Sequence, residues 1–145
     1  DTYNGYNSGQ QGNPWSLLTS AAAEYNYCLV ETWNGAGKVT ITQAVYSYLV
    51  QLTSLYGITF TNSISVGSTH PKGSATFTEI LNSAFSASDL YMARVAHHTT
   101  ADGSMWEEWN RETGASQGAL QLTWSHQAHS AASRHRAAAL AIVGA

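Results

Sequence analysis

Apolar residues recur three and four positions apart in four stretches of this 145-residue chain, and this spacing predicts four helices. The first helix is expected to begin at Asn13 and Pro14, because asparagine caps free backbone amides and proline fits the first turn. The Asn-Gly-Ala-Gly sequence at residues 34–37 is expected to end it. The second helix is predicted to begin at Thr40, with Gln43 completing a capping box.

The second half of the chain contains two further helical patterns. The third helix is predicted to begin with another capping box, Thr76 and Glu79, and to continue to about His98. The fourth begins near Thr123 and is rich in alanine, which suits close packing between helices. Residues 99–118 between these helices are polar, and they predict a loop.

Residues 57–73 break the helical spacing, because isolated apolar residues stand there among serines and threonines. They predict a loop or a short β-ribbon. The chain is therefore expected to be all-α, with about four helices and long loops. The helices carry so little charge that several are expected to bury two faces, which requires more helices than this chain supplies. We expect it to be part of a larger all-α assembly.

The composition and the apolar pattern exclude nucleic-acid binding through a basic face and a membrane-spanning segment. Charged residues make up only 10% of the chain, and the net charge is −3, so a basic face that binds nucleic acid is excluded. No apolar run approaches the roughly 20 residues of a membrane-spanning helix. The single cysteine, Cys28, excludes an internal disulfide and predicts either a buried inert thiol or a bridge to a segment outside this sequence.

The polar residues suit a carbohydrate site. Five tryptophans and eight tyrosines stand among many serines, threonines, asparagines and glycines. Aromatic rings stack on the apolar faces of sugars, although any single ring can equally belong to the core. A surface rich in hydroxyl groups and poor in lysine also fits a secreted, extracellular protein.

Residues 102–110 hold the densest group of polar and aromatic side chains. The adjacent carboxylates Glu107 and Glu108, flanked by Trp106 and Trp109, have the chemistry for general acid–base catalysis on a sugar. The alternative is an exposed loop whose acidic side chains are only solvated.

Six histidines raise the question of a metal site, and four of them form two close sets, 97–98 and 126 with 129. Zinc sites take three or four ligands at recognisable spacings, and these histidines complete no such pattern. No glycine-rich nucleotide motif is present either. We therefore expect neither a metal ion nor a cofactor.

Four short sequences carry a resemblance to fungal glucoamylases, in the order and near the spacing of that family. They are Asp-Thr-Tyr at residues 1–3, Gly-Asn-Pro-Trp at 12–15 with Ala-Ala-Ala-Glu at 21–24, Gly-Ser-Met-Trp-Glu at 103–107, and Leu-Thr-Trp-Ser at 122–125. The resemblance implies an (α/α)6 barrel of a secreted, inverting exo-hydrolase. Such enzymes release β-glucose from the non-reducing ends of starch chains, cutting α-1,4 and more slowly α-1,6 bonds.

The resemblance also assigns roles to residues. Glu107 matches the family's general base, and Trp15, Tyr3 and Trp124 match aromatic residues that line the sugar sites. An inverting glycosidase also needs a general acid, about 6.5–9.5 Å from the base. Glu108 departs from the family, which usually has glutamine there, and repulsion between buried carboxylates predicts that it points away from Glu107.

The motifs of the family's general acid do not occur in this sequence. Residues 1–145 therefore resemble the C-terminal third of a glucoamylase-like catalytic domain, and the chain alone is expected to be inactive. Its expected partners are starch or malto-oligosaccharides and the remaining segments of the domain, with no nucleic acid or membrane. Two alternatives stay open: a non-catalytic helical fragment that binds sugar or another partner, and a related glycosidase with another linkage preference.

Overall fold

The computed structural model describes residues 12–144, and four helices and four short strands make up its regular structure. Their bounds are α1 Ser16–Ala36, β1 Lys38–Thr40, α2 Gln43–Tyr56, β2 Thr69–Pro71, α3 Ala75–His97, β3 Trp106–Trp109, β4 Ser116–Leu120 and α4 Thr123–Val143. The prediction of four helices is confirmed. Within the described residues, no helix is both long and apolar enough to cross a membrane.

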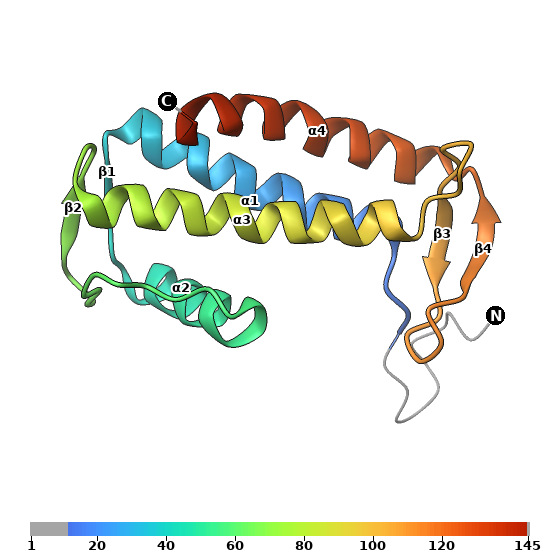
Figure 1. Ribbon diagram of the computed structural model, residues 1–145, viewed down its shortest axis with the longest axis horizontal. Coiled ribbons are helices and arrows are strands. Elements are labelled where there is room, and N and C mark those ends of the chain that lie inside the picture. The colour runs from blue at the N-terminus through green and yellow to red at the C-terminus, as the bar shows by residue number, and fades with distance from the viewer. Residues whose placement is uncertain (1–11, 145) are drawn as a thin grey trace.

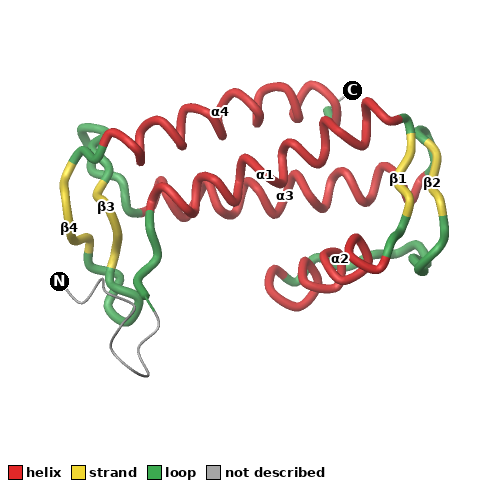
Figure 2. The backbone as a smooth tube through the Cα atoms, turned by 180° about the vertical axis from the view of Figure 1, so that it is seen from behind, coloured by secondary structure: helices red, strands yellow, loops and turns green. Residues whose placement is uncertain are grey.

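The three long helices lie side by side, and α3 runs opposite to α1 and α4 (Figure 1). Helix α2 lies against α3, away from α4, as the view from behind also shows (Figure 2). One end of this helical body carries β1 and β2, and the other carries the β3–β4 hairpin. The first residues of α1 and α4 therefore lie at the end with the hairpin.

Both predicted capping boxes are wrong, although each helix begins within three residues of its predicted start. Helix α2 is capped by Thr42, whose hydroxyl accepts a hydrogen bond from the Val45 N–H at 3.2 Å. Thr40 belongs instead to β1, where it pairs with Thr69. Ser74 caps α3 by accepting from the N–H of its third residue.

The start of α1 also differs from the prediction. Its capping position is Trp15, which has an extended backbone and makes no capping hydrogen bond through its side chain. The side chain of Asn13 is turned instead toward β3, where its amide donates to Glu108 at 3.1 Å. A long-range contact therefore replaces the local cap.

The prediction of a loop over residues 99–118 is wrong, because this segment contains β3 and most of β4. The two strands pair antiparallel, with Trp106 opposite Leu120 and Glu108 opposite Gln117. Of residues 57–73, the last part forms β2, which pairs with β1 rather than within the segment. The predicted β-ribbon is therefore present, but its first strand lies before α2.

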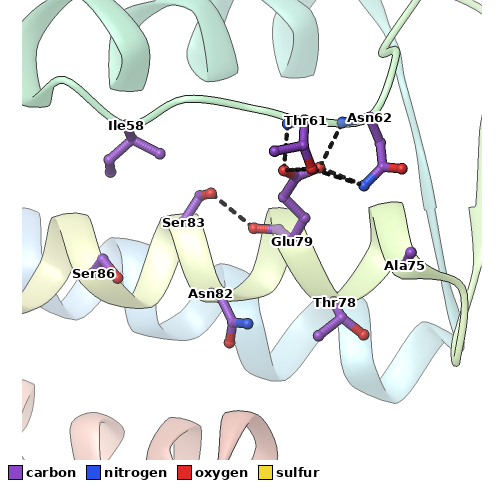
Figure 3. A pocket seen from close by; sticks show the side chains of 9 residues that line it. All are labelled: Ile58, Thr61, Asn62, Ala75, Thr78, Glu79, Asn82, Ser83 and Ser86. Carbon is purple, nitrogen blue, oxygen red and sulfur yellow. Dashed lines mark hydrogen bonds between the residues drawn. The ribbon is translucent and has the colours of Figure 1, made fainter.

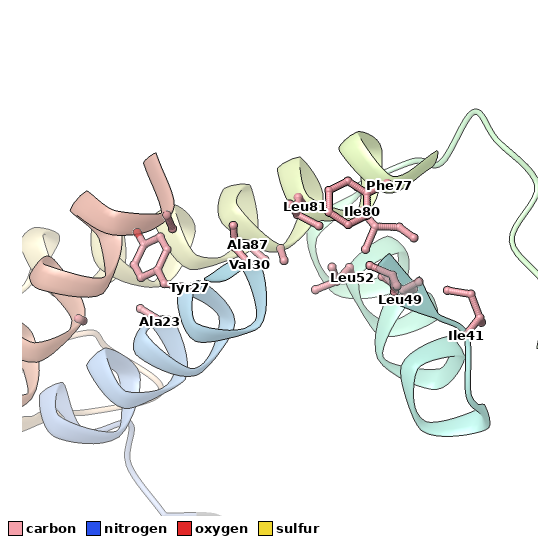
Figure 4. Packing of buried hydrophobic residues seen from close by; sticks show 14 residues of the cluster. Ala23, Tyr27, Val30, Ile41, Leu49, Leu52, Phe77, Ile80, Leu81 and Ala87 are labelled. Atoms are coloured by element: carbon pink, nitrogen blue, oxygen red, sulfur yellow. The ribbon is translucent and has the colours of Figure 1, made fainter. Parts of the chain in front are cut away.

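The buried core has two parts (Figure 4). Small residues bring the long helices close together, as Ala23 of α1, Ala87 of α3 and Ala132 of α4 illustrate, since all three are fully buried. Beside them, Leu49 and Leu52 of α2 join the larger apolar residues of the cluster. The members of the core cluster are Ala23, Tyr27, Val30, Val39, Ile41, Leu49, Leu52, Phe77, Ile80, Leu81, Ala84, Ala87, Ala132 and Ala139.

Some apolar residues that recur at helical spacing lie outside this core. Leu18 and Tyr25 of α1 and Leu55 of α2 are each more than 60% exposed. Helical spacing identifies the apolar side of a helix, but it does not tell which apolar residues face a neighbour.

Candidate active site

Glu107 lies on β3 opposite a bulge in β4. Between the pairs Trp106–Leu120 and Glu108–Gln117, two residues of β4, Gly118 and Ala119, face the single residue Glu107. The extra residue turns the Ala119 N–H toward the half-buried carboxylate, and it donates to Oε2 at 3.0 Å. Bulges of this kind re-aim side chains beside active sites.

Gly118 makes this arrangement possible. Its φ of +81° is in the region that favours glycine, and an added Cβ would lie 2.6 Å from Glu107 Oε2. The absence of a side chain at residue 118 therefore leaves the space that the carboxylate occupies. Among the described residues, the Ala119 N–H is the donor to this carboxylate, and Oε1 remains available to water or substrate.

Glu108 points away from Glu107, as expected. It is only 1% exposed, and its Oε1 accepts hydrogen bonds from Asn13 at 3.1 Å and from Gln117 at 2.8 Å. Its Oε2 is buried and has no partner in the part of the chain that the structure describes. Glu108 therefore connects the segment before α1 to both strands of the hairpin.

Trp15 lies beside this hairpin. Its backbone pairs with that of Glu108, and the Trp109 N–H donates to the Pro14 carbonyl at 3.1 Å. The Ser16 hydroxyl donates to the Trp106 carbonyl at 2.6 Å. These contacts join residues far apart in the sequence, and they place Trp15 alongside β3, the strand that contains Glu107.

Trp124 lies in the first turn of α4 and is 62% exposed. The segment before it is fixed to the loop that precedes β3. The Gln121 N–H donates to the Met105 carbonyl at 2.9 Å, and the Gln121 side chain donates to the Ser104 hydroxyl at 2.8 Å. The start of α4 is therefore held at the same end of the molecule as Glu107. Tyr3, the fourth predicted site residue, lies outside the described residues.

Sequence reasoning missed the residues that support this site. Asn13 and Gln117 hold Glu108, and the His98 ring stacks on Trp109 with 4.2 Å between ring centroids. Burial, followed by the nearby His97 and Arg94, lowers the pKa of His98. Asn13 and Glu108 stand 95 residues apart, so no local spacing signals their contact.

A different arrangement surrounds Glu79, in the cavity between residues 58–62 and α3 (Figure 3). Its carboxylate accepts four hydrogen bonds from the backbone and side chains of Thr61 and Asn62. Burial opposes its ionisation, but these hydrogen bonds outweigh burial and lower the pKa of Glu79 to about 2. This carboxylate fixes the loop after α2 to α3, and its oxygens are occupied.

Cys28 is half-buried on α1, with its sulfur 3.4 Å from His135 Nδ1. Burial and the nearby Glu31 and Glu24 raise the pKa of the Cys28 thiol. A thiol in these surroundings is not an activated nucleophile.

Residues 1–133 match the glycosyl hydrolases family 15. The chain belongs to this family. It is 35% identical to a glucoamylase of Neurospora crassa over 87% of its length, and 34% identical to glucoamylase 1 of Rhizopus oryzae over 96%. It spans only 19% and 22% of those two proteins, or about a fifth of each.

Solved structures of the family have the same fold. The family 15 glucoamylase from Hypocrea jecorina matches 88% of this chain with a TM-score of 0.74 and 33% identity. A glucoamylase from Saccharomycopsis fibuligera matches 98% of it with a TM-score of 0.75 and 32% identity. The chain covers 20% and 29% of these proteins. The resemblance to glucoamylases is therefore confirmed, and the four helices form a sector of an (α/α)6 barrel.

Proposed function

We propose that this chain supplies the general base of a secreted, starch-degrading glucoamylase that releases β-glucose from non-reducing ends. The observation that carries the proposal is the position of Glu107. The Ala119 N–H fixes one carboxylate oxygen, Gly118 leaves room for the group, and Trp15 lies beside the same strand. A base must be held still and yet keep an oxygen for the water that it deprotonates. Glu107 meets both requirements.

The proposed hydrolysis inverts the anomeric configuration, with the general base on this chain and the general acid on another segment. In an inverting glycosidase, the base activates a water on one face of the sugar while an acid protonates the departing oxygen on the other. We place the acid on a segment outside these 145 residues, at roughly 6.5–9.5 Å from Glu107, because water must fit between the two groups. Residues 1–145 are then the C-terminal third of the catalytic domain, and alone they are inactive.

Trp15 and Trp124, with Tyr3, are proposed to line the sugar sites. Trp15 directly precedes α1 and Trp124 lies in the first turn of α4, and both helices begin at the hairpin end (Figure 1). The exposed ring of Trp124 is available for stacking on a sugar. The preferred bonds are α-1,4 and, more slowly, α-1,6. This assignment draws support from relatives that are named glucoamylases.

The test replaces Glu107 with glutamine in the longer enzyme that contains these residues. Glu107→Gln keeps the size of the side chain and an oxygen that can accept from Ala119, but it removes the base. Because general base catalysis contributes typically 10²–10⁴-fold, we expect glucose release from maltotetraose to fall by about that factor while binding is kept. Glu112→Gln, at an exposed position of the hairpin turn, is the matched control.

Other outcomes of these measurements would favour a non-catalytic, sugar-binding fragment or a glycosidase with another linkage preference. Unchanged hydrolysis by Glu107→Gln would remove Glu107 from the mechanism. Sugar binding with no hydrolysis by the unaltered enzyme would favour a non-catalytic, sugar-binding role. A panel of maltose, isomaltose, trehalose and cellobiose separates a glucoamylase from a glycosidase with another linkage preference.

A further inference from the structure

Three side chains of metal-ligating types converge between α1 and α4. The Cys28 sulfur lies 3.4 Å from His135 Nδ1, and this nitrogen lies 2.7 Å from an oxygen of Glu31. All three ligand atoms fall within 4.8 Å of one another. The cluster lies outside the proposed active site, because Cys28 is about 18 Å along α1 from Ser16, at 1.5 Å per residue.

The helices bring this cluster together. Cys28 and Glu31 stand three residues apart on α1 and so share one face, and Glu24 stands one turn before Cys28. His135 reaches them from α4, which packs along α1. The sequence gives no signal of this contact, because His135 is 107 residues from Cys28.

We propose that Cys28, Glu31 and His135 form a binding site for a divalent transition-metal ion of the zinc class. Thiolate, imidazole and carboxylate are the ligand types that zinc takes, and three protein ligands leave a fourth position for water. In this chain, the ligand side chains of Glu31 and His135 are 32% and 37% exposed.

The distances fit this proposal. Tetrahedral zinc with ordinary bond lengths places sulfur and nitrogen about 3.6 Å apart, and nitrogen and oxygen about 3.4 Å apart. The corresponding distances here are 3.4 and 2.7 Å, so a small rotation of Glu31 opens the space for an ion. The ion takes the place of the proton between His135 and Glu31 and of the Cys28 thiol proton, and both protons are released to solvent.

A fourth side chain supports the same assignment. Ligating histidines nearly always give their second ring N–H to a carboxylate or carbonyl, which fixes the ring. An oxygen of Glu24 lies 3.6 Å from Nε2 of His135, so a small shift of the Glu24 side chain would let it accept the second ring N–H. The bound ion ties α1 to α4 and also balances the negative charge of Glu24, Glu31 and the thiolate.

The experiment titrates the reduced, purified enzyme with Co²⁺ and then displaces it with Zn²⁺. Cobalt bound to a thiolate has an intense charge-transfer absorption that cobalt bound only to oxygen or nitrogen lacks. We expect this absorption in the unaltered protein and its loss in Cys28→Ser. The metal affinity should fall at least tenfold in His135→Asn and Glu31→Gln, and about 10–100-fold in Glu24→Gln.

His126→Asn, on the same helix but away from the cluster, is the control and should keep the full affinity. Circular dichroism of each variant separates loss of the ligand from loss of the fold, and three independent ligand variants keep the test valid if one does not fold. The proposal is overturned if the folded protein shows no cobalt–thiolate absorption, if Cys28→Ser keeps it, or if thiol titration finds Cys28 oxidised.

Discussion

Two half-buried glutamates at opposite ends of the molecule are held in contrasting ways. Within the described residues, Glu79 accepts four hydrogen bonds from Thr61 and Asn62, whereas Glu107 accepts one, from the Ala119 N–H. The four donors around Glu79 occupy both of its oxygens and lower its pKa to about 2. Such a group fixes a loop and has little tendency to take up a proton. Glu107 is positioned but keeps an oxygen for chemistry.

Glu108 is a third case beside these two. It is buried and fixed by two amide donors, so it is not accessible to water. The three glutamates differ in the number and placement of their donors, and under the proposed function this difference separates a structural carboxylate from a reactive one.

Gly118→Ala should have the largest effect of the variants that leave Glu107 itself unchanged. An alanine Cβ would lie 2.6 Å from Glu107 Oε2 and 2.9 Å from its Cβ, so the carboxylate must move. A misplacement of about 1 Å can cost about 100-fold in rate, and we expect a loss of that order in kcat for maltotetraose.

The matched control for this prediction is Gly103→Ala. Gly103 has a similar φ of +85°, but a Cβ there would meet nothing within 4 Å. Both variants should lose about 1 kcal/mol of stability through backbone strain, and only Gly118→Ala should lose the rate. An equal loss of rate in both would mean that strain, not the position of Glu107, accounts for it.

Glu108→Ala should mainly affect stability. It leaves the Asn13 and Gln117 amides without their acceptor and should lower the free energy of unfolding by about 2 kcal/mol. Glu108→Gln keeps an acceptor oxygen and should cost less than about 1 kcal/mol. Urea denaturation measures both, and an equally large loss in the glutamine variant would show that the charge itself is required.

Trp124→Ala should weaken substrate binding without unfolding the protein. The ring is 62% exposed and adds little to the core, whereas a stacked aromatic contact contributes about 0.5–1.5 kcal/mol. We expect KM for maltotetraose to rise by up to about tenfold, with kcat and the thermal midpoint little changed. A lower midpoint with an unchanged KM would contradict a sugar-binding role.

Glu79→Gln should have the smallest effect, and that effect should depend on pH. The folded protein lowers the pKa of Glu79 from 4.5 to about 2, so the unfolded state binds this proton more tightly. Ionised Glu79 therefore stabilises the fold above about pH 4.5, and the contribution is lost as the pH falls toward 2. Solvent screening limits it to about 1 kcal/mol at neutral pH.

The measurement is the difference in unfolding free energy between the unaltered protein and Glu79→Gln from pH 7 to pH 2. The difference should shrink below pH 4.5, while glucose release at neutral pH stays the same. A difference that does not change with pH would show that the hydrogen bonds do not depend on the charge of Glu79.

The four helices could be predicted from sequence because their apolar spacing is a local signal. The capping boxes could not, because Thr40 and Thr76 have Gln or Glu three residues later and fit the pattern, whereas the true caps, Thr42 and Ser74, do not. The β3–β4 hairpin was also missed. Residues 116–120 read Ser-Gln-Gly-Ala-Leu, which has no alternation of apolar and polar residues, and the hairpin depends on contacts with the segment before α1.

The candidate active site could also be predicted from sequence only where the signal is local. Glu107, Trp15 and Trp124 could be proposed because they lie in short sequences that resemble a family. The bulge at Gly118, the support from Asn13 and Gln117, and the cluster around His135 could not, because each depends on residues brought together by the fold.

The most direct test of the account is proton NMR of maltotetraose during hydrolysis, which follows the anomeric signals of newly released glucose. The longer enzyme that contains this chain and its Glu107→Gln variant are measured side by side. If Glu107 is the general base of an inverting enzyme, β-glucose appears first with the unaltered enzyme and its release nearly stops in the variant. Early α-glucose, or β-glucose released at the same rate by the variant, would contradict it.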